Sequence, residues 1–281
     1  MTTQNRVAAI TAHMFHGAHE AADDIQLIQT KHRVKLIDAW QIKPGMHILE
    51  IGSGQGDMTA ALAYTVGATG SVTAIDIAPE VYGAPFTIGQ GMHYLQQSAI
   101  GANITAYFNT DLLVDAQVLA GRHFDAIVFA HSSWYFASQA QFQAMLSLLK
   151  PMADYLYYAE WDLELSEPAQ FNHYLAATVQ AQFGAFQTNQ QANIRTLISK
   201  FDFANMVANL PATIIRQASF DAEDMQDGNW EVGGAKYFIT PKNLATTDLD
   251  AKTKQLLLTQ IGLMTGPTKA LDTYWAAVQL N

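Results

Sequence analysis

The middle of the chain alternates short apolar runs with amphipathic stretches. The apolar runs predict five buried strands, over residues 46–51, 71–77, 103–108, 124–130 and 155–161. The stretches between them predict helices over 58–66, 89–98 and 139–149. Continuous apolar runs such as 126–129, each separated from the next by a helix, are typical of a parallel sheet covered on both faces. The pattern therefore predicts a doubly wound α/β domain.

The two ends of the chain depart from this alternation. Apolar residues three and four apart predict a helix over 17–40, and residues 167–210 predict a helical insertion without strands. Two further strands, 214–220 and 230–239, are predicted as a hairpin-like pair, because the turn residues Asp227-Gly228-Asn229 lie between them. Helices over 249–264 and 268–280 would close the chain.

These patterns divide the chain into four segments of one structural domain. We expect N-terminal helices over 1–43 that serve as a candidate lid, and an α/β core over 44–162. A helical cap would occupy 163–212, and closing strands and helices would occupy 213–281.

Composition and charge narrow the classes of function. The 281 residues include 49% hydrophobic ones and no cysteine, and 15 Lys and Arg face 25 Asp and Glu, for a formal net charge of −10. The apolar content supports a large core and excludes a disordered chain. The acidic balance argues against a nucleic-acid partner, which needs Lys and Arg. Without cysteine, disulfides, thiolate metal sites and cysteine nucleophiles are excluded.

The apolar runs are also too short for a membrane partner. No window approaches the roughly 18 uninterrupted apolar residues of a membrane span, and the first 15 residues lack the apolar core of a signal peptide. We therefore expect a cytoplasmic protein. The oligomeric state is left open, with a homodimer among the options.

A glycine-rich loop joins the first predicted strand to the first helix of the core. Glycines at positions 52, 54 and 56 allow positive φ and close approach of the backbone to a ligand. The dinucleotide fingerprint would require a third glycine at position 57, where Asp57 instead places an anion at a pyrophosphate site. This departure disfavours NAD and FAD. Asp76 ends the second strand, where a carboxylate can accept hydrogen bonds from the ribose of any adenosine cofactor.

The pattern of Glu50, the three glycines and Asp76 resembles the class I S-adenosylmethionine-dependent methyltransferases. The resemblance implies S-adenosyl-L-methionine as cofactor and a Rossmann-like, seven-stranded sheet, mostly parallel with an antiparallel last strand. It implies that the glycine loop packs against the amino-acid part of the cofactor, that Asp76 holds the ribose and that Asp111 contacts the adenine amine. The cofactor-binding residues implied in this way are Glu50, Gly52, Ser53, Gly54, Gly56, Asp76, Ile77, Asp111, Leu112 and His131.

The segment after the fourth strand carries the candidate catalytic residue. His131 follows that strand at the edge where ligands of open α/β sheets bind. As a neutral imidazole it is a candidate general base, and the alternative is a histidine that hydrogen-bonds the cofactor or the loop backbone.

Acidic and aromatic side chains surround this position in the sequence. Glu160 and Asp162 would face the same side of the fifth strand, where they share a proton, bind a cationic substrate or lie in solvent. Trp134, Tyr135 and Trp161 suit a pocket for a flat organic substrate, and the alternative for such residues is core packing.

Two further groups of residues are assigned no site. His13, His16 and His19 recur three apart, but no carboxylate is shown to converge on them, so we predict a mobile polar helix or lid and no metal. Lys31, Arg33 and Lys35 are interpreted as a solvated helix face.

We therefore predict a methyltransferase that acts on a small organic acceptor through O- or N-methylation by in-line displacement. One alternative is an S-adenosylmethionine-binding protein without methyl transfer, either cyclase-like or regulatory. The other is a nicotinamide-dependent oxidoreductase, which Asp57 disfavours.

Overall fold

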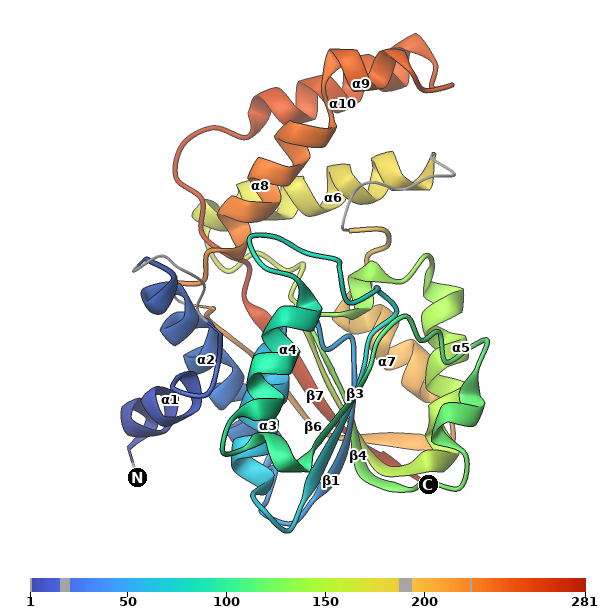
Figure 1. The fold of residues 1–281 in the computed structure, drawn as a ribbon. Helices are drawn as coiled ribbons and strands as arrows, with labels where there is room; N and C mark the ends of the chain where they lie inside the picture. Colours follow the sequence, from blue (N-terminus) through green and yellow to red (C-terminus); the bar gives the residue numbers. More distant parts are fainter. Residues whose placement is uncertain (1, 16–20, 187–193, 223) are drawn as a thin grey trace.

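A single seven-stranded sheet forms the centre of the molecule (Figure 1). The computed structural model describes residues 2–15, 21–186, 194–222 and 224–281. The strands are β1 (His47–Ile51), β2 (Ser71–Ile75), β3 (Ile104–Tyr107), β4 (Phe124–Ala130), β5 (Ala153–Trp161), β6 (Ala212–Phe220) and β7 (Thr273–Leu280). Their order is β3-β2-β1-β4-β5-β7-β6, and β7 runs antiparallel to both of its neighbours. The predicted fold class is confirmed.

Helices lie on both faces of the sheet and over one edge of it (Figure 1). They are α1 (Thr3–Thr11), α2 (Ala21–Trp40), α3 (Asp57–Val66), α4 (Ile88–Gln97), α5 (Gln139–Leu149), α6 (Phe171–Ala185), α7 (Lys200–Ala208), α8 (Asp227–Phe238), α9 (Pro241–Ala245) and α10 (Ala251–Leu263). Short 3-10 turns cover Gly101–Asn103, Ala116–Leu119, Ser133–Tyr135, Lys150–Met152 and Pro168–Gln170. No helix among these described residues is long and apolar enough to cross a membrane.

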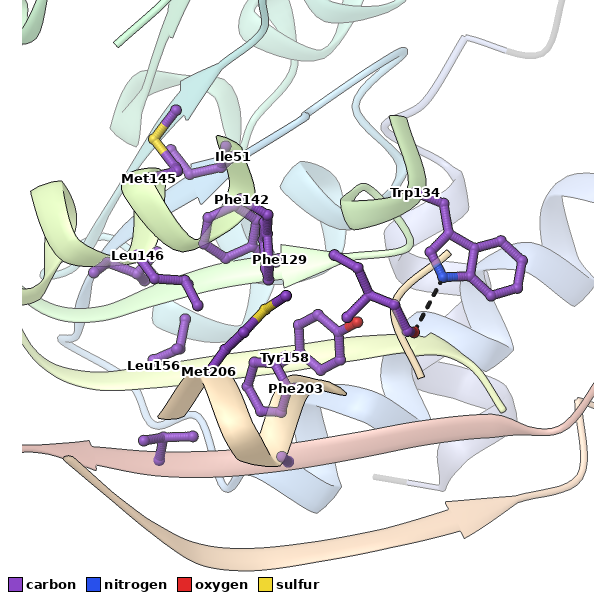
Figure 2. Packing of buried hydrophobic residues seen from close by; sticks show 14 of the residues in the cluster. Ile51, Phe129, Trp134, Phe142, Met145, Leu146, Leu156, Tyr158, Phe203 and Met206 are labelled. Atoms are coloured by element: carbon purple, nitrogen blue, oxygen red, sulfur yellow. Dashed lines mark hydrogen bonds between the residues drawn. The ribbon is translucent and has the colours of Figure 1, made fainter. Parts of the chain in front are cut away.

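Successive residues of the central strands feed two separate cores. Val128 of β4 joins the core under α1 to α4, while the next residue, Phe129, joins the core under α5 and α7. This alternation follows from the period of two along a strand, and it explains why the central strands read as continuous apolar runs. Figure 2 shows the second core, in which Phe203 of α7 stacks on Tyr158 of β5 with ring centroids 3.8 Å apart.

A third apolar cluster holds α6, α8, α9 and α10 together, and Figure 1 shows these helices as a layer beyond one end of the sheet. The layer meets the carboxyl end of β5, because His173 of α6 packs edge-on against Trp161 with ring centroids 5.2 Å apart. We call these four helices the upper layer. By contrast α7, from the same insertion as α6, packs against the sheet at β6 and β5.

Two elements at the end of the chain differ from the prediction. The predicted strand 230–239 is helix α8, whose Ala235 is buried in the upper layer. The predicted helix 268–280 is instead β7, inserted between β5 and β6. The partner of the predicted strand 214–220 is therefore β7, which is also antiparallel to β5. A short apolar run fits either a buried helix or a buried strand. Residues 273–280 form a strand because β5 and β6 pair with them on both sides.

Candidate active site

The glycine loop runs between β1 and α3 with all three glycines at positive φ. The φ angles of Gly52, Gly54 and Gly56 are 81°, 52° and 97°. A Cβ at Gly52 would lie 2.5 Å from the Cβ of Ser132, far inside van der Waals contact. Ser132 follows His131, and its hydroxyl donates to the Ile51 carbonyl over 2.8 Å. The absent side chain at Gly52 thus lets the loop lie directly against the segment that carries His131.

Asp76, just beyond β2, ties the second strand to the glycine loop. Its Oδ2 accepts a hydrogen bond from the Gly54 amide and its Oδ1 accepts one from the Ala78 amide, each over 2.8 Å. Its backbone carbonyl accepts a hydrogen bond from the Thr110 amide over 3.1 Å, and Asp111 is the next residue after Thr110. Each carboxylate oxygen has a second lone pair, so Asp76 retains acceptor capacity for ribose hydroxyls.

Three further predicted cofactor residues, which follow β2 and β3 in the chain, differ in exposure. Ile77 is 59% exposed. Leu112 is buried in the core under α5 and α7. Asp111 is partly buried, and its Oδ1 accepts the Leu113 amide over 3.0 Å.

Glu50 lies beneath the loop as a buried carboxyl group. Burial raises its pKa to about 8, the charges of Asp76 and Asp57 add to the increase, and a hydrogen bond from Thr59 and the charge of Arg33 oppose it. The hydroxyl of Thr59 donates to Glu50 Oε2 over 2.6 Å.

The loop offers polar groups that have no partner within the described chain. Ser53 is buried, and its hydroxyl oxygen has no hydrogen-bond partner among the described residues. A buried hydroxyl without a partner costs about 1–3 kcal/mol, which a bound polar ligand would recover. Helix α3 begins at Gly56 without a side-chain cap, so its N-terminal dipole faces the loop uncovered.

His131 lies at the centre of the candidate site. It has φ of 53°, and its amide donates to the Ala159 carbonyl over 2.9 Å. Its Nδ1 is 3.5 Å from Glu160 Oε1 and has no hydrogen-bond partner in the described part of the chain. The ring packs on Trp161, with centroids 4.2 Å apart. His131 is thus oriented by a buried acid and an aromatic ring.

Glu160 and Asp162 face separate partners. Glu160 Oε2 accepts hydrogen bonds from the Ser133 hydroxyl at 2.7 Å and from the Ser133 amide at 3.1 Å. Asp162 lies beyond the end of β5 and accepts from the Ser219 hydroxyl at 2.6 Å and from Lys200 at 3.3 Å. Both carboxylates are buried. Glu160 therefore belongs to the His131 site, and Asp162 joins β5 to β6 and α7.

Two of the predicted pocket aromatics, Trp134 and Tyr135, occupy different surroundings. Trp134 is 2% exposed in the core, and its indole donates to the Ile198 carbonyl over 3.2 Å (Figure 2). This burial leaves Trp134 no open face, so its predicted place in the substrate pocket is not supported. Tyr135 is 47% exposed. Its ring edge is thus open to solvent, whereas its hydroxyl end is enclosed, and desolvation of that hydroxyl together with the charges of Glu231, Glu160 and Asp227 raises the pKa of Tyr135.

Sequence reasoning missed His32 of α2, which contacts His131 directly. The two Nε2 atoms lie 2.9 Å apart, so one nitrogen donates a proton and the other accepts it. Burial lowers the pKa of His32, and the charges of His131, Arg33 and Lys35 lower it further. The only signal in the sequence is a histidine at the four-residue spacing of Ile28 and Leu36, within an apolar helix stripe.

His173 and Glu231 of the upper layer also lie at this edge. Burial and the charge of His131 lower the pKa of His173 to about 3. Burial raises the pKa of Glu231 to about 7, against a hydrogen bond from Gln180, with Asp227 and Glu160 adding to the increase. The helical insertion thus reaches His131, which no motif indicates.

The N-terminal helices cover the glycine loop from the other side. Gln26 of α2 donates to Asp57 over 2.8 Å, and Phe15 packs edge-on against Phe86 with ring centroids 5.0 Å apart. A cavity of about 10 Å³ remains between Met14, Phe15 and the loop at Gly56. His16 and His19 lie outside the described residues. Within the described residues, no group of three or more acidic and histidine side chains could hold a metal ion.

Comparison with known proteins identifies the same family. A family model described as a methyltransferase domain matches residues 19–208. The methyltransferase phomM' of Diaporthe leptostromiformis is 29% identical in an alignment 224 positions long, which covers 66% of this chain and 58% of that protein. The chain therefore spans less than two thirds of the length of this curated relative.

Solved structures agree with the fold. The crystal structure of a cyclopropane-fatty-acyl-phospholipid synthase-like protein from Lactobacillus casei is 34% identical, with a TM-score of 0.90 over 98% of this chain and 99% of that one. Magnesium protoporphyrin IX methyltransferase from Synechocystis, with bound S-adenosylhomocysteine, is 14% identical with a TM-score of 0.51 over 99% and 94%, which shows the fold alone. With the glycine loop and Asp76 in place, the chain belongs to the class I S-adenosylmethionine-dependent methyltransferases.

Proposed function

We propose that the protein transfers the methyl group of S-adenosylmethionine to an oxygen or nitrogen atom of a small organic acceptor. The observation that carries the proposal is the contact between the glycine loop and the segment after β4. Because Gly52 lies against Ser132, a cofactor on the loop would present its methyl group beside His131.

Different residues of the chain would hold the three parts of the cofactor. The amides of the loop from Gly52 to Gly56 and the Ser53 hydroxyl would contact its amino-acid part, Asp76 its ribose, and Ile77 and Asp111 its adenine. When bound, the cofactor supplies an electrophilic methyl group on a positively charged sulfur. The attacking atom of the acceptor forms the new bond as the bond to sulfur breaks.

The protein's contribution would be positioning, exclusion of water and removal of a proton. His131 is 8% exposed at its side chain and sits beside the buried Glu160 carboxylate, which would stabilise an imidazolium. It would accept the proton that a hydroxyl or ammonium acceptor loses. The acids Glu231 and Asp227 of α8, near Tyr135, would favour an acceptor that carries a positive charge.

The upper layer and the N-terminal helices would enclose the acceptor. His173 of α6 reaches the His131 site, and Gln29 of α2 donates to Asp227 of α8 over 2.8 Å. This contact joins the two coverings across the site. We propose the upper layer as the cap and residues 1–43 as the lid.

Two variants test the proposal with calorimetry and a turnover assay that detects S-adenosylhomocysteine. Asp76→Ala should weaken cofactor binding by about 2–3 kcal/mol, because hydrogen bonds to a charged acceptor are lost. His131→Ala should preserve binding and reduce turnover about 100-fold. Wild-type protein that does not bind the cofactor would refute the proposal. Binding without turnover on any acceptor would instead support a regulatory or cyclase-like protein.

A second candidate acceptor is the carbon-carbon double bond of an unsaturated fatty acyl phospholipid. It is favoured by the 34% identity to the protein from Lactobacillus casei over nearly the whole chain. Incubation with labelled cofactor and either vesicles of an unsaturated phospholipid or a panel of small phenols and amines separates the two. Label in the lipid would replace the first candidate by the second.

A further inference from the structure

Arg33 of α2 has an environment that its sequence context does not indicate. The run Lys31, Arg33, Lys35 is interpreted above as a solvated face, and Lys31 is indeed exposed. Arg33 is only partly exposed, and its Nε and Nη1 atoms are fully buried without a hydrogen-bond partner among the described residues. Because unpaired buried donors on a charged group are costly, this guanidinium lacks the acceptor that its position calls for.

The position of Arg33 on α2 directs it toward the glycine loop. Gln26, seven residues earlier and therefore on the same helix face, donates to Asp57 at the start of α3. The neighbouring residue His32 contacts His131 after β4. The charge of Arg33 lowers the pKa of Glu50 at the end of β1. Arg33 therefore lies over the glycine loop, between Glu50 at its start and Asp57 at its end.

The charges around the loop show which ligand group Arg33 would meet. Glu50, Asp57 and Asp76 make this region acidic, and the positive charge of Arg33 acts on Glu50. The amino-acid end of S-adenosylmethionine carries an ammonium group and a carboxylate beside the sulfonium. The acids suit the two cationic groups, but the carboxylate needs a donor, and the planar fork of arginine matches a carboxylate in bidentate geometry.

We propose that Arg33 binds the α-carboxylate of the cofactor, so that α2 is part of the cofactor site rather than a packing helix only. The inference rests on the proposed function and extends it to a residue outside the glycine motif. Helix α2 is already fixed on both sides of this position, through Gln26 at Asp57 and through His32 at His131.

The test compares two ligands that differ only in the group that Arg33 would hold. Calorimetry measures the binding of S-adenosylmethionine and of decarboxylated S-adenosylmethionine to wild-type protein and to Arg33→Met. We expect the variant to bind the intact cofactor about 10- to 100-fold more weakly, the loss of a charge-assisted hydrogen-bond pair. It should bind the decarboxylated ligand within about threefold of wild type.

Two further variants complete the design. Arg33→Lys keeps the charge without the fork and should lose an intermediate amount of affinity for the intact cofactor only. Lys31→Met, an exposed position on the same helix, should change neither affinity.

Three outcomes overturn a claim, and they differ from one another. Unchanged binding of the intact cofactor by both Arg33 variants would overturn the assignment while leaving the proposed function standing. Equal losses for both ligands would show that Arg33 acts on folding, and would overturn it as well. Wild-type protein that binds neither ligand would refute the proposed function itself.

Discussion

Replacing Glu50 by Gln should stabilise the ligand-free protein in alkaline solution. Glutamine keeps an oxygen acceptor for the Thr59 hydroxyl and removes a carboxyl group whose pKa is raised, chiefly by burial, from 4.5 to about 8. The folded wild type holds the Glu50 proton more tightly than the unfolded chain does, so this bound proton stabilises the folded state. The wild type has this stabilisation in full below pH 4.5 and loses it as the pH rises to about 8. Glutamine has no such proton, so the variant loses nothing over that range.

The magnitude follows from the width of that window. At about 1.4 kcal/mol per pKa unit, the carboxylate costs on the order of 5 kcal/mol above pH 8. In a chain of this size that corresponds to about 10 °C or more in melting temperature. Thermal unfolding of wild type and Glu50→Gln, followed by circular dichroism from pH 4 to 9, measures the difference.

The expected result is a gap that is small near pH 4 and widens steadily toward pH 8. The same variant should bind S-adenosylmethionine more weakly, because it no longer offers a negative charge to the cationic amino-acid end. A gap that stays constant across the pH range would show that Glu50 ionises normally, and the account of its burial would then be wrong.

Three more outcomes follow from the same structure. Cofactor binding near pH 7 should release a proton, because Glu50 ionises when the cationic cofactor binds. The measured binding enthalpy should then change with the ionisation enthalpy of the buffer. An enthalpy that is the same in all buffers would contradict this. Phe203→Ala should lower the free energy of unfolding by about 3–5 kcal/mol in denaturant titrations, because the Phe203 ring is buried against Tyr158. Phe201, on the same helix, is 63% exposed, so Phe201→Ala should change that free energy by no more than about 0.5 kcal/mol. Gly52→Ala should lower stability by about 2 kcal/mol or more, and wild-type melting would mean that Ser132 moves aside.

Local patterns were enough to predict most of the core. The glycines at 52, 54 and 56 between an apolar run and a helix indicated a ligand-binding turn, and all three take positive φ. The residues from 126 to 129 predicted a strand buried on both faces, and they feed two different cores. Both features are set by neighbours within a few residues, so a sequence read in short windows contains them.

The closing elements and several side-chain environments depend on distant parts of the chain. The run 273–280 became a strand because β5 and β6 offered their edges, and 227–238 became a helix because it packs on α6. No window contains those partners. Trp134 was predicted in a pocket and is in the core, since aromatic composition does not distinguish the two.

The sequence by itself determined the family, the α/β alternation and the positions of Asp76 and His131, because a glycine loop between a strand and a helix, an acid at the next strand end and buried parallel strands leave local signatures. Only the tertiary structure decided what surrounds His131. It brought His32 from position 32, Glu160 from β5 and His173 from α6 to one edge of the sheet, and it buried two nitrogens of Arg33 over the glycine loop. Packing between distant segments makes these contacts, and burial in that packing changes the pKa and the exposure of a side chain, neither of which the residue type alone determines.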